Sequence, residues 1–159
     1  METSFYFTER QKAAILVVLE NIANSDGDFD ENEQVIIDGC KNNFLKFDMS
    51  SERGLELFRE VQQMSFDELI QIIKPLSRLQ QEYILIYACK VIAADGIIDD
   101  NENIAIGNLC AKLEISPKEF DKIQKKYLKT EKQFYNQKPG CFSVLLLFII
   151  SVISIFLFV

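Results

Sequence analysis

The chain contains no histidine and no tryptophan, and only 3 of its 159 residues are proline and 6 glycine. Without histidine, the sequence excludes Ser-His and Cys-His catalysis, histidine-bound zinc and the His-Pro-Asp motif of a J-domain. The 4 cysteines form no Cys-x-x-Cys pair, and no glycine-rich phosphate loop is present. These absences predict that the protein is not a classical enzyme.

Charged residues are missing altogether from the C-terminal segment 142–159, which also lacks glycine, proline and amide side chains. As a helix this segment would span about 27 Å, close to the hydrocarbon thickness of a bilayer. The alternative is a buried helix of a globular core. We expect a single C-terminal transmembrane helix over 142–159, a short linker over 138–141 and one folded domain over 1–137.

The charges before this segment are unevenly distributed. Residues 1–111 contain 9 Lys and Arg against 20 Asp and Glu, whereas residues 112–138 contain 8 lysines against 4 acidic residues. Lysines beside a membrane helix favour a cytoplasmic domain and suit contact with anionic lipid. The same lysines could equally form the solvated face of an amphipathic helix. The acidic body argues against a nucleic-acid partner.

The apolar spacing is helical throughout and predicts an all-α fold of about seven helices. We expect Val35, Ile36, Ile104 and Ile106 to face the core, and Cys40, Cys89 and Cys110 to be reduced thiols that fill it. The expected helices run from Thr8 to about Asn24, after Asp30 as far as Phe44, from Ser50 or Ser51, from Ser65 to before Pro75, from about Ser77 to Ala93, after Asp99, and from Ser116 toward Phe134.

An acidic loop occurs twice at a constant offset, over Ile22–Glu33 and Val91–Glu102. Its shared pattern is Asp-Gly-x-x-Asp-x-Asn-Glu. Because each copy stands between two expected helices, it indicates a duplicated helix–loop–helix unit. It is not an EF-hand loop, whose glycine falls at the sixth position. The repeated positions are Asp26, Asp30 and Glu33 in the first copy and Asp95, Asp99 and Glu102 in the second.

Two interpretations of this loop stay open. In the first, the glycine ends one helix, while Asp30 or Asp99 caps the next and Glu33 or Glu102 closes a capping box. In the second, the six carboxylates bind a hard divalent cation, with Ca²⁺ as the leading candidate. A metal-assisted hydrolase built on these carboxylates is the single enzymatic alternative, and nothing else in the sequence supports it.

The paired loops, together with Lys112–Phe120 (sequence KLEISPKEF), resemble the TerB-like family, named for tellurite-resistance protein B. The resemblance covers roughly residues 8–135 and is stronger in the second loop than in the first. It implies a compact bundle with both acidic loops on one side, calcium or another divalent cation at the six acidic residues, and a membrane-linked stress-resistance or defence setting. Some family members carry a J-domain and act as co-chaperones. This chain has no J-domain, so the resemblance does not extend to that role.

The sequence therefore predicts a non-catalytic binding module anchored in a membrane by one helix. We expect it to bind a divalent cation and to dock a protein partner at the cytoplasmic face. The alternative is a metal-free helical adaptor or a small structural subunit of a membrane protein complex.

Overall fold

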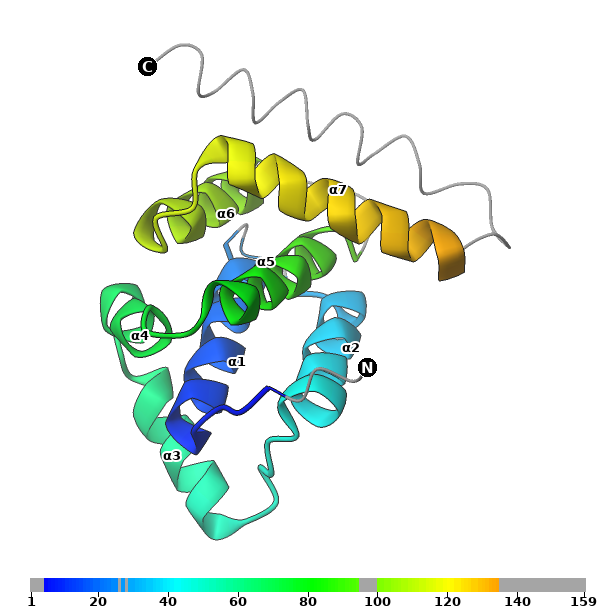
Figure 1. Ribbon diagram of the computed structural model, residues 1–159. Coiled ribbons are helices and arrows are strands. Elements are labelled where there is room, and N and C mark those ends of the chain that lie inside the picture. Colours follow the sequence, from blue (N-terminus) through cyan, green and yellow to red (C-terminus); the bar gives the residue numbers. More distant parts are fainter. Residues whose placement is uncertain (1–4, 26, 28, 95–99, 135–159) are drawn as a thin grey trace.

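The structure is a computed structural model that describes residues 5–25, 27, 29–94 and 100–134, with side chains as far as 126. These residues form helices and contain no strand, which confirms the all-α prediction (Figure 1). The elements are α1 (Glu9–Ala23), α2 (Glu31–Gly39), the π-helix η1 (Cys40–Leu45), α3 (Glu52–Gln62), α4 (Phe66–Ile73), α5 (Arg78–Ile92), α6 (Asp100–Lys112) and α7 (Pro117–Phe134).

The predicted helix starts are confirmed wherever the structure describes the cap, because each start is fixed by residues only three positions apart. The first turn of a helix leaves backbone N–H groups without partners, and a short polar side chain at the N-cap satisfies one of them. In a capping box the third helical residue bonds back to the cap. This reciprocal pair closes at Thr8–Gln11, Asp30–Glu33, Ser65–Glu68, Ser77–Gln80 and Ser116–Glu119.

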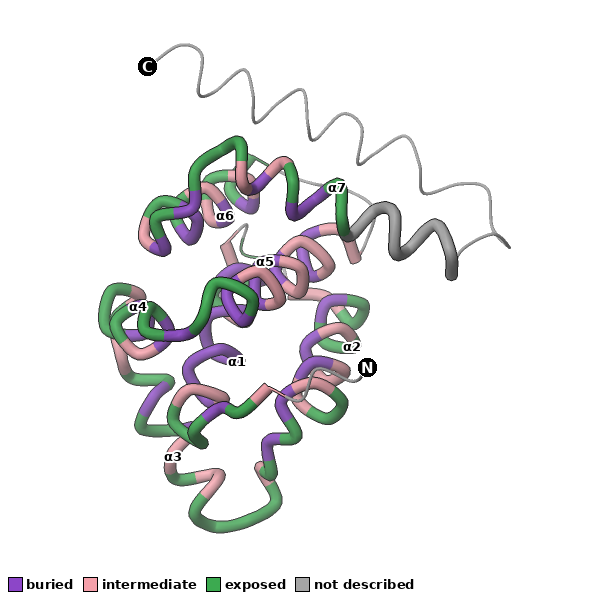
Figure 2. Tube along the Cα trace, in the orientation of Figure 1, coloured by how far each residue is buried: buried purple, intermediate pink, exposed green. Residues whose placement is uncertain are grey.

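Helix α1 forms the centre of the molecule. Its buried residues lie on every side, including the unbroken run from Ala13 to Leu19. A helix that is apolar all round must be surrounded by other elements, and α1 contacts α2, α3, α4, α5 and α6. Figure 2 shows this burial as the continuous purple stretch of α1 between the partly green surface helices. Helix α5 is the second internal element and contacts α1, α2, α6 and α7.

Two residues expected in the core lie at the surface. Val35 of α2 is 68% exposed and Ile104 of α6 is 55% exposed. Helix α2 instead buries Glu33 and Ile37, and α6 buries Glu102 and Ile106. Glu33 and Ile37, four residues apart, share the buried face of α2, and Val35 between them lies on the opposite side; Glu102, Ile106 and Ile104 are related in the same way in α6.

The second predicted helix does not continue as an α-helix to Phe44. From Cys40 to Leu45 the backbone is a π-helix, which ends at Lys46 with φ 51°. Within this turn Phe44 contacts aromatic rings from two other segments, the N-terminal residues and α5. The Phe44 ring stacks on Tyr83 with centroids 5.6 Å apart, and it lies 5.8 Å from Phe5. A π-helical turn of this kind frequently accompanies a functional surface.

The prediction of buried, reduced thiols is confirmed for Cys40 and Cys110. Cys40 and Cys110 are buried, Cys89 is half-buried, and all three are free. Burial raises the pKa of Cys40 and of Cys110 to about 12 and raises the pKa of Cys89 as well. Because the thiolate is the reactive form, these groups are unreactive at neutral pH.

Over the part of the chain that the structure describes, no helix is both long and apolar enough to cross a bilayer. The segment 142–159 lies outside the described residues, as does the expected linker 138–141. The C-terminal anchor and the domain boundary therefore stay predictions.

The capping carboxylates lead to a prediction for acidic pH. A side-chain hydrogen bond from Ser65 holds the pKa of Glu68 below its ordinary value of 4.5, and the Ser116 backbone N–H does the same for Glu119. Since both pKa values are lower in the folded state, their stabilisation is complete above pH 4.5 and is lost as the pH falls through the folded pKa values. We expect the melting temperature, followed by circular dichroism, to fall steadily below about pH 4.5.

The control for this prediction is the double variant Glu68→Gln, Glu119→Gln. Glutamine already closes the same box at Gln11 and Gln80, so the caps should persist. The variant should melt at a somewhat lower temperature at pH 7, because it lacks the two charges that the folded state stabilises, and it should show a shallower decline in acid. An unchanged acid profile would mean that these two carboxylates are not responsible.

Candidate functional site

The first acidic loop closes a complete capping box at the start of α2. The Glu33 backbone N–H donates to Asp30 Oδ1 at 2.8 Å, and the Asp30 N–H donates to Glu33 Oε2 at 3.0 Å. The Asn32 side-chain amide donates to Asp30 Oδ2 at 3.0 Å. Gly27 has φ 89°, in the left-handed region that glycine adopts without strain. The expected capping box of Asp30 and Glu33 is therefore confirmed, whereas Gly27 does not end α1, whose C-cap is Asn24.

Three of the six predicted metal ligands lie outside the described residues: Asp26, Asp95 and Asp99. Asp30 and Glu33 come together at the start of α2, and Glu102 is the third residue of α6. Among the side chains that the structure does place, no three Cys, Asp or Glu residues are grouped so that they could hold a metal ion. The predicted cation site stays a prediction, because half of its ligands are not among those side chains.

Glu33 and Glu102 differ from the other residues at the third position of a helix. They are only 5% and 4% exposed. At the same position Glu68 is exposed, and the Glu119 side chain is 44% exposed. One other described helix, α5, also buries its third residue, but that residue is Gln80, which carries no charge. Capping by itself therefore requires neither the burial nor the charge of Glu33 and Glu102.

Burying a carboxylate removes its hydration, so its charge has to be balanced by hydrogen bonds, a cationic group or a metal. Glu33 and Glu102 both have interactions of this kind. Beside Glu33, the backbone hydrogen bond from Glu33 lowers the pKa of Asp30, which keeps that carboxylate ionised near neutral pH. Ionised oxygens at a loop that follows a left-handed glycine are chemically suited to a hard divalent cation.

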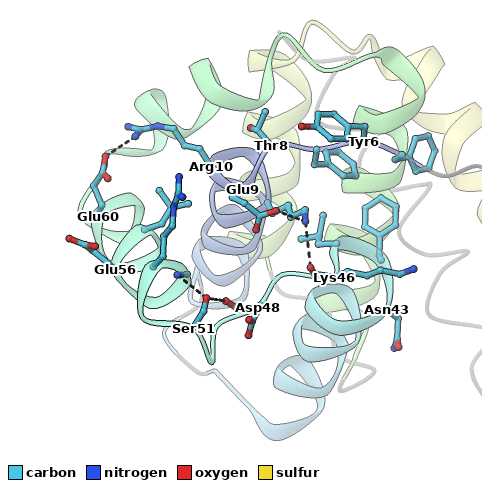
Figure 3. A pocket seen from close by; sticks show the side chains of 18 residues that line it. Tyr6, Thr8, Glu9, Arg10, Asn43, Lys46, Asp48, Ser51, Glu56 and Glu60 are labelled. Carbon is cyan, nitrogen blue, oxygen red and sulfur yellow. Dashed lines mark hydrogen bonds and ion pairs between the residues drawn. The ribbon is translucent and has the colours of Figure 1, made fainter.

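A groove of about 1330 Å³ lies elsewhere on the molecule, between the N-terminal strap (residues 5–10), residues 43–48 and α3 (Figure 3). Its lining combines apolar side chains, among them Phe44 and Leu57, with charged ones. Arg10 and Glu60 form an ion pair at 2.7 Å on one side of the groove, while Lys46 and Asn43 line the opposite side in Figure 3.

The size and lining of this groove suit a polypeptide. Pockets for drug-sized ligands enclose roughly 300–1,000 Å³ and are predominantly apolar. Here the volume is larger and the charges have both signs: the Lys12 ammonium pairs with Glu9 at 2.6 Å and also reaches the Lys46 carbonyl at 3.5 Å. The groove could not be predicted from the sequence, because its walls come from segments that lie far apart in the chain.

Comparison with known proteins identifies the fold alone. No protein-family model matches the chain, and no curated protein matches it either. A crystal structure of a protein of unknown function from Porphyromonas gingivalis is similar, with a TM-score of 0.57 and 16% sequence identity. The similarity covers 79% of this chain and 99% of that one. The TerB-like resemblance stays a prediction.

Proposed function

We propose that this protein is a non-catalytic TerB-like binding module, tethered to a membrane by residues 142–159. Its duplicated acidic loops bind a divalent cation, with Ca²⁺ as the leading candidate, and its helical surface docks a protein partner at the cytoplasmic face. The stress-resistance or defence setting rests on the family resemblance alone.

The observation that carries the cation proposal is the burial of two carboxylates at equivalent positions of the two loops. Glu33 and Glu102 occupy the same place in the sequence repeat, and each is the third residue of a helix that follows an acidic loop. The ion supplies positive charge when bound. The residues that would hold it are Asp26, Asp30 and Glu33 with Asp95, Asp99 and Glu102.

The groove of Figure 3 supports the partner-docking half of the proposal. Its apolar side chains give a partner segment area to bury. Its polar rim, with Arg53 and Glu56 on α3, supplies groups that select the partner by charge.

A metal-free adaptor, or a small structural subunit of a membrane complex, is the second candidate. It is favoured by the first loop, where both Asp30 oxygens already accept hydrogen bonds from the chain itself. On this interpretation the acidic loops serve only to start α2 and α6.

Calorimetric titration of the full chain in lipid nanodiscs with Ca²⁺, and then Mg²⁺ and Mn²⁺, separates the two candidates. We expect saturable binding that the double variant Glu33→Gln, Glu102→Gln weakens at least about tenfold, since glutamine retains the cap but removes the charge. The matched control Glu68→Gln, Glu119→Gln changes the same helix position at two exposed sites and should bind normally. No binding at millimolar ion would establish the metal-free adaptor.

A further inference from the structure

A second hollow, of about 450 Å³, lies between α6 and the start of α7, and none of the described residues that line it is charged. Its lining includes the buried side chains of Ile106, Cys110, Ile115 and Phe120. In a chain with 26% charged residues, an uncharged surface hollow is unusual. We refer to it as the α6–α7 groove.

The surface that α6 presents to this groove is apolar, and two of its residues are small. Ile104, Gly107 and Ala111 follow one another at helical spacing along the groove, and Ile104 is one of the few large apolar side chains at the surface. A Cβ added to Gly107 would meet no atom within 4 Å. A glycine in mid-helix weakens the helix, and here it leaves room for another segment to approach the backbone closely.

The groove also contains an unsatisfied hydrogen-bond acceptor. Asn103 Oδ1 is buried and has no hydrogen-bond partner among the described residues, and Asn103 belongs to the lining. A buried amide carbonyl without a donor costs free energy, so an occupant that brings a hydroxyl or N–H group would gain from pairing with it once the Asn103 side chain turns its oxygen toward the groove.

We propose that residues 142–159 occupy the α6–α7 groove when no membrane is available. The chain length fits this occupant. Helix α7 has 18 residues and the apolar segment also has 18, so both span about 27 Å as helices. A short connection that includes Pro139-Gly140 separates them. A segment that turns there and runs back antiparallel to α7 reaches Pro117 and Phe120, which line the groove.

The chemistry of the segment matches the groove as well. Both lack charge, and the polar groups of the segment are the hydroxyls of Ser143, Ser151 and Ser154; in the antiparallel arrangement Ser151 and Ser154 are the two nearer the groove, and either can donate to Asn103 Oδ1. The volume admits a few large side chains, so the groove covers the part of the segment that reaches Pro117 and Phe120. The groove thereby keeps the apolar segment from aggregating in water and releases it to a bilayer. This proposal rests on the membrane tether of the proposed function, but on neither the cation site nor the groove of Figure 3.

Photo-crosslinking of the full chain tests the proposal. The protein is made by cell-free translation without membranes or detergent, with p-benzoylphenylalanine in place of Ile104. We expect crosslinks within one chain to peptides from 142–159, identified by mass spectrometry, and a decline when phosphatidylcholine–phosphatidylserine vesicles are added. The same probe in place of Val35, which is also exposed but lies on α2, should give no such product.

Filling the groove should displace the segment. We expect Gly107→Leu to lower the crosslink yield at least about fivefold. Gly39→Leu is the matched control: Gly39 also lies in a helix with no atom within 4 Å of an added Cβ, and it does not line the groove. Crosslinks between two chains would overturn the proposal in favour of a dimer. A yield unaffected by Gly107→Leu, or products that exclude 142–159, would overturn it outright.

Discussion

Replacing both Ile149 and Ile153 with lysine is expected to release the full chain from membranes. Both residues lie near the middle of the apolar segment, where a lysine costs about 2.5–3.5 kcal/mol on insertion scales. Two lysines therefore disfavour insertion by about 5–7 kcal/mol, which is more than a thousandfold in partitioning. Flotation of the translated protein with vesicles measures the bound fraction before and after an alkaline wash.

Ser143→Lys is the control, because it adds a charge at the edge of the same segment. A lysine there can extend to the head groups, so binding should persist. If the Ile149→Lys, Ile153→Lys variant still floats after the alkaline wash, the segment is not a membrane anchor. That result would favour the alternative that residues 142–159 form a buried helix of the domain. The crosslinking experiment at Ile104 would then show which part of the domain this helix contacts.

Leu85→Ala is expected to destabilise the folded domain by about 2–5 kcal/mol, the cost of removing a buried leucine and leaving a cavity. Leu85 is fully buried on α5, the helix that joins α1 and α2 to α6 and α7. Since small domains are stable by only about 5–15 kcal/mol, this is a large share of the total. The melting temperature of the full chain in nanodiscs should fall by about 10 °C.

Leu79→Ala makes the same substitution on the same helix at an exposed position. It should lower stability by less than about 0.5 kcal/mol, as surface substitutions usually do. Equal effects of the two variants would mean that α5 is not the internal helix described here. The comparison also matters for the cation site, because α5 packs against both α2 and α6, whose third residues are Glu33 and Glu102.

The helix starts could be predicted from the sequence because capping is local. Ser65 with Glu68, or Ser116 with Glu119, closes its hydrogen bonds within a single turn, whatever the rest of the chain does. The same holds for Asp30 with Glu33. The all-α class follows from the apolar spacing over longer segments, and the buried thiols follow from the positions of the cysteines within it.

The direction in which α2 and α6 face could not be predicted as well. Val35 and Ile104 were expected inside because apolar residues usually are, but the burial of Glu33 and Glu102 turns both helices the other way. The π-helical turn at Cys40–Leu45 was also missed. No short pattern indicates it, since it is stabilised by contacts of Phe44 with Phe5 and Tyr83, which lie far from it in the sequence on either side.

By itself the sequence determined the helical class, the helix starts and the duplicated loop, because these depend on residues within one turn or on a repeat visible along the chain. Only the tertiary structure decided that two loop carboxylates are buried and that Phe5 meets Tyr83. It also decided that α3 and the N-terminal strap enclose one groove, and α6 and α7 another. These features arise from packing between segments distant in sequence, where the area buried by the whole core outweighs the preference of any single side chain.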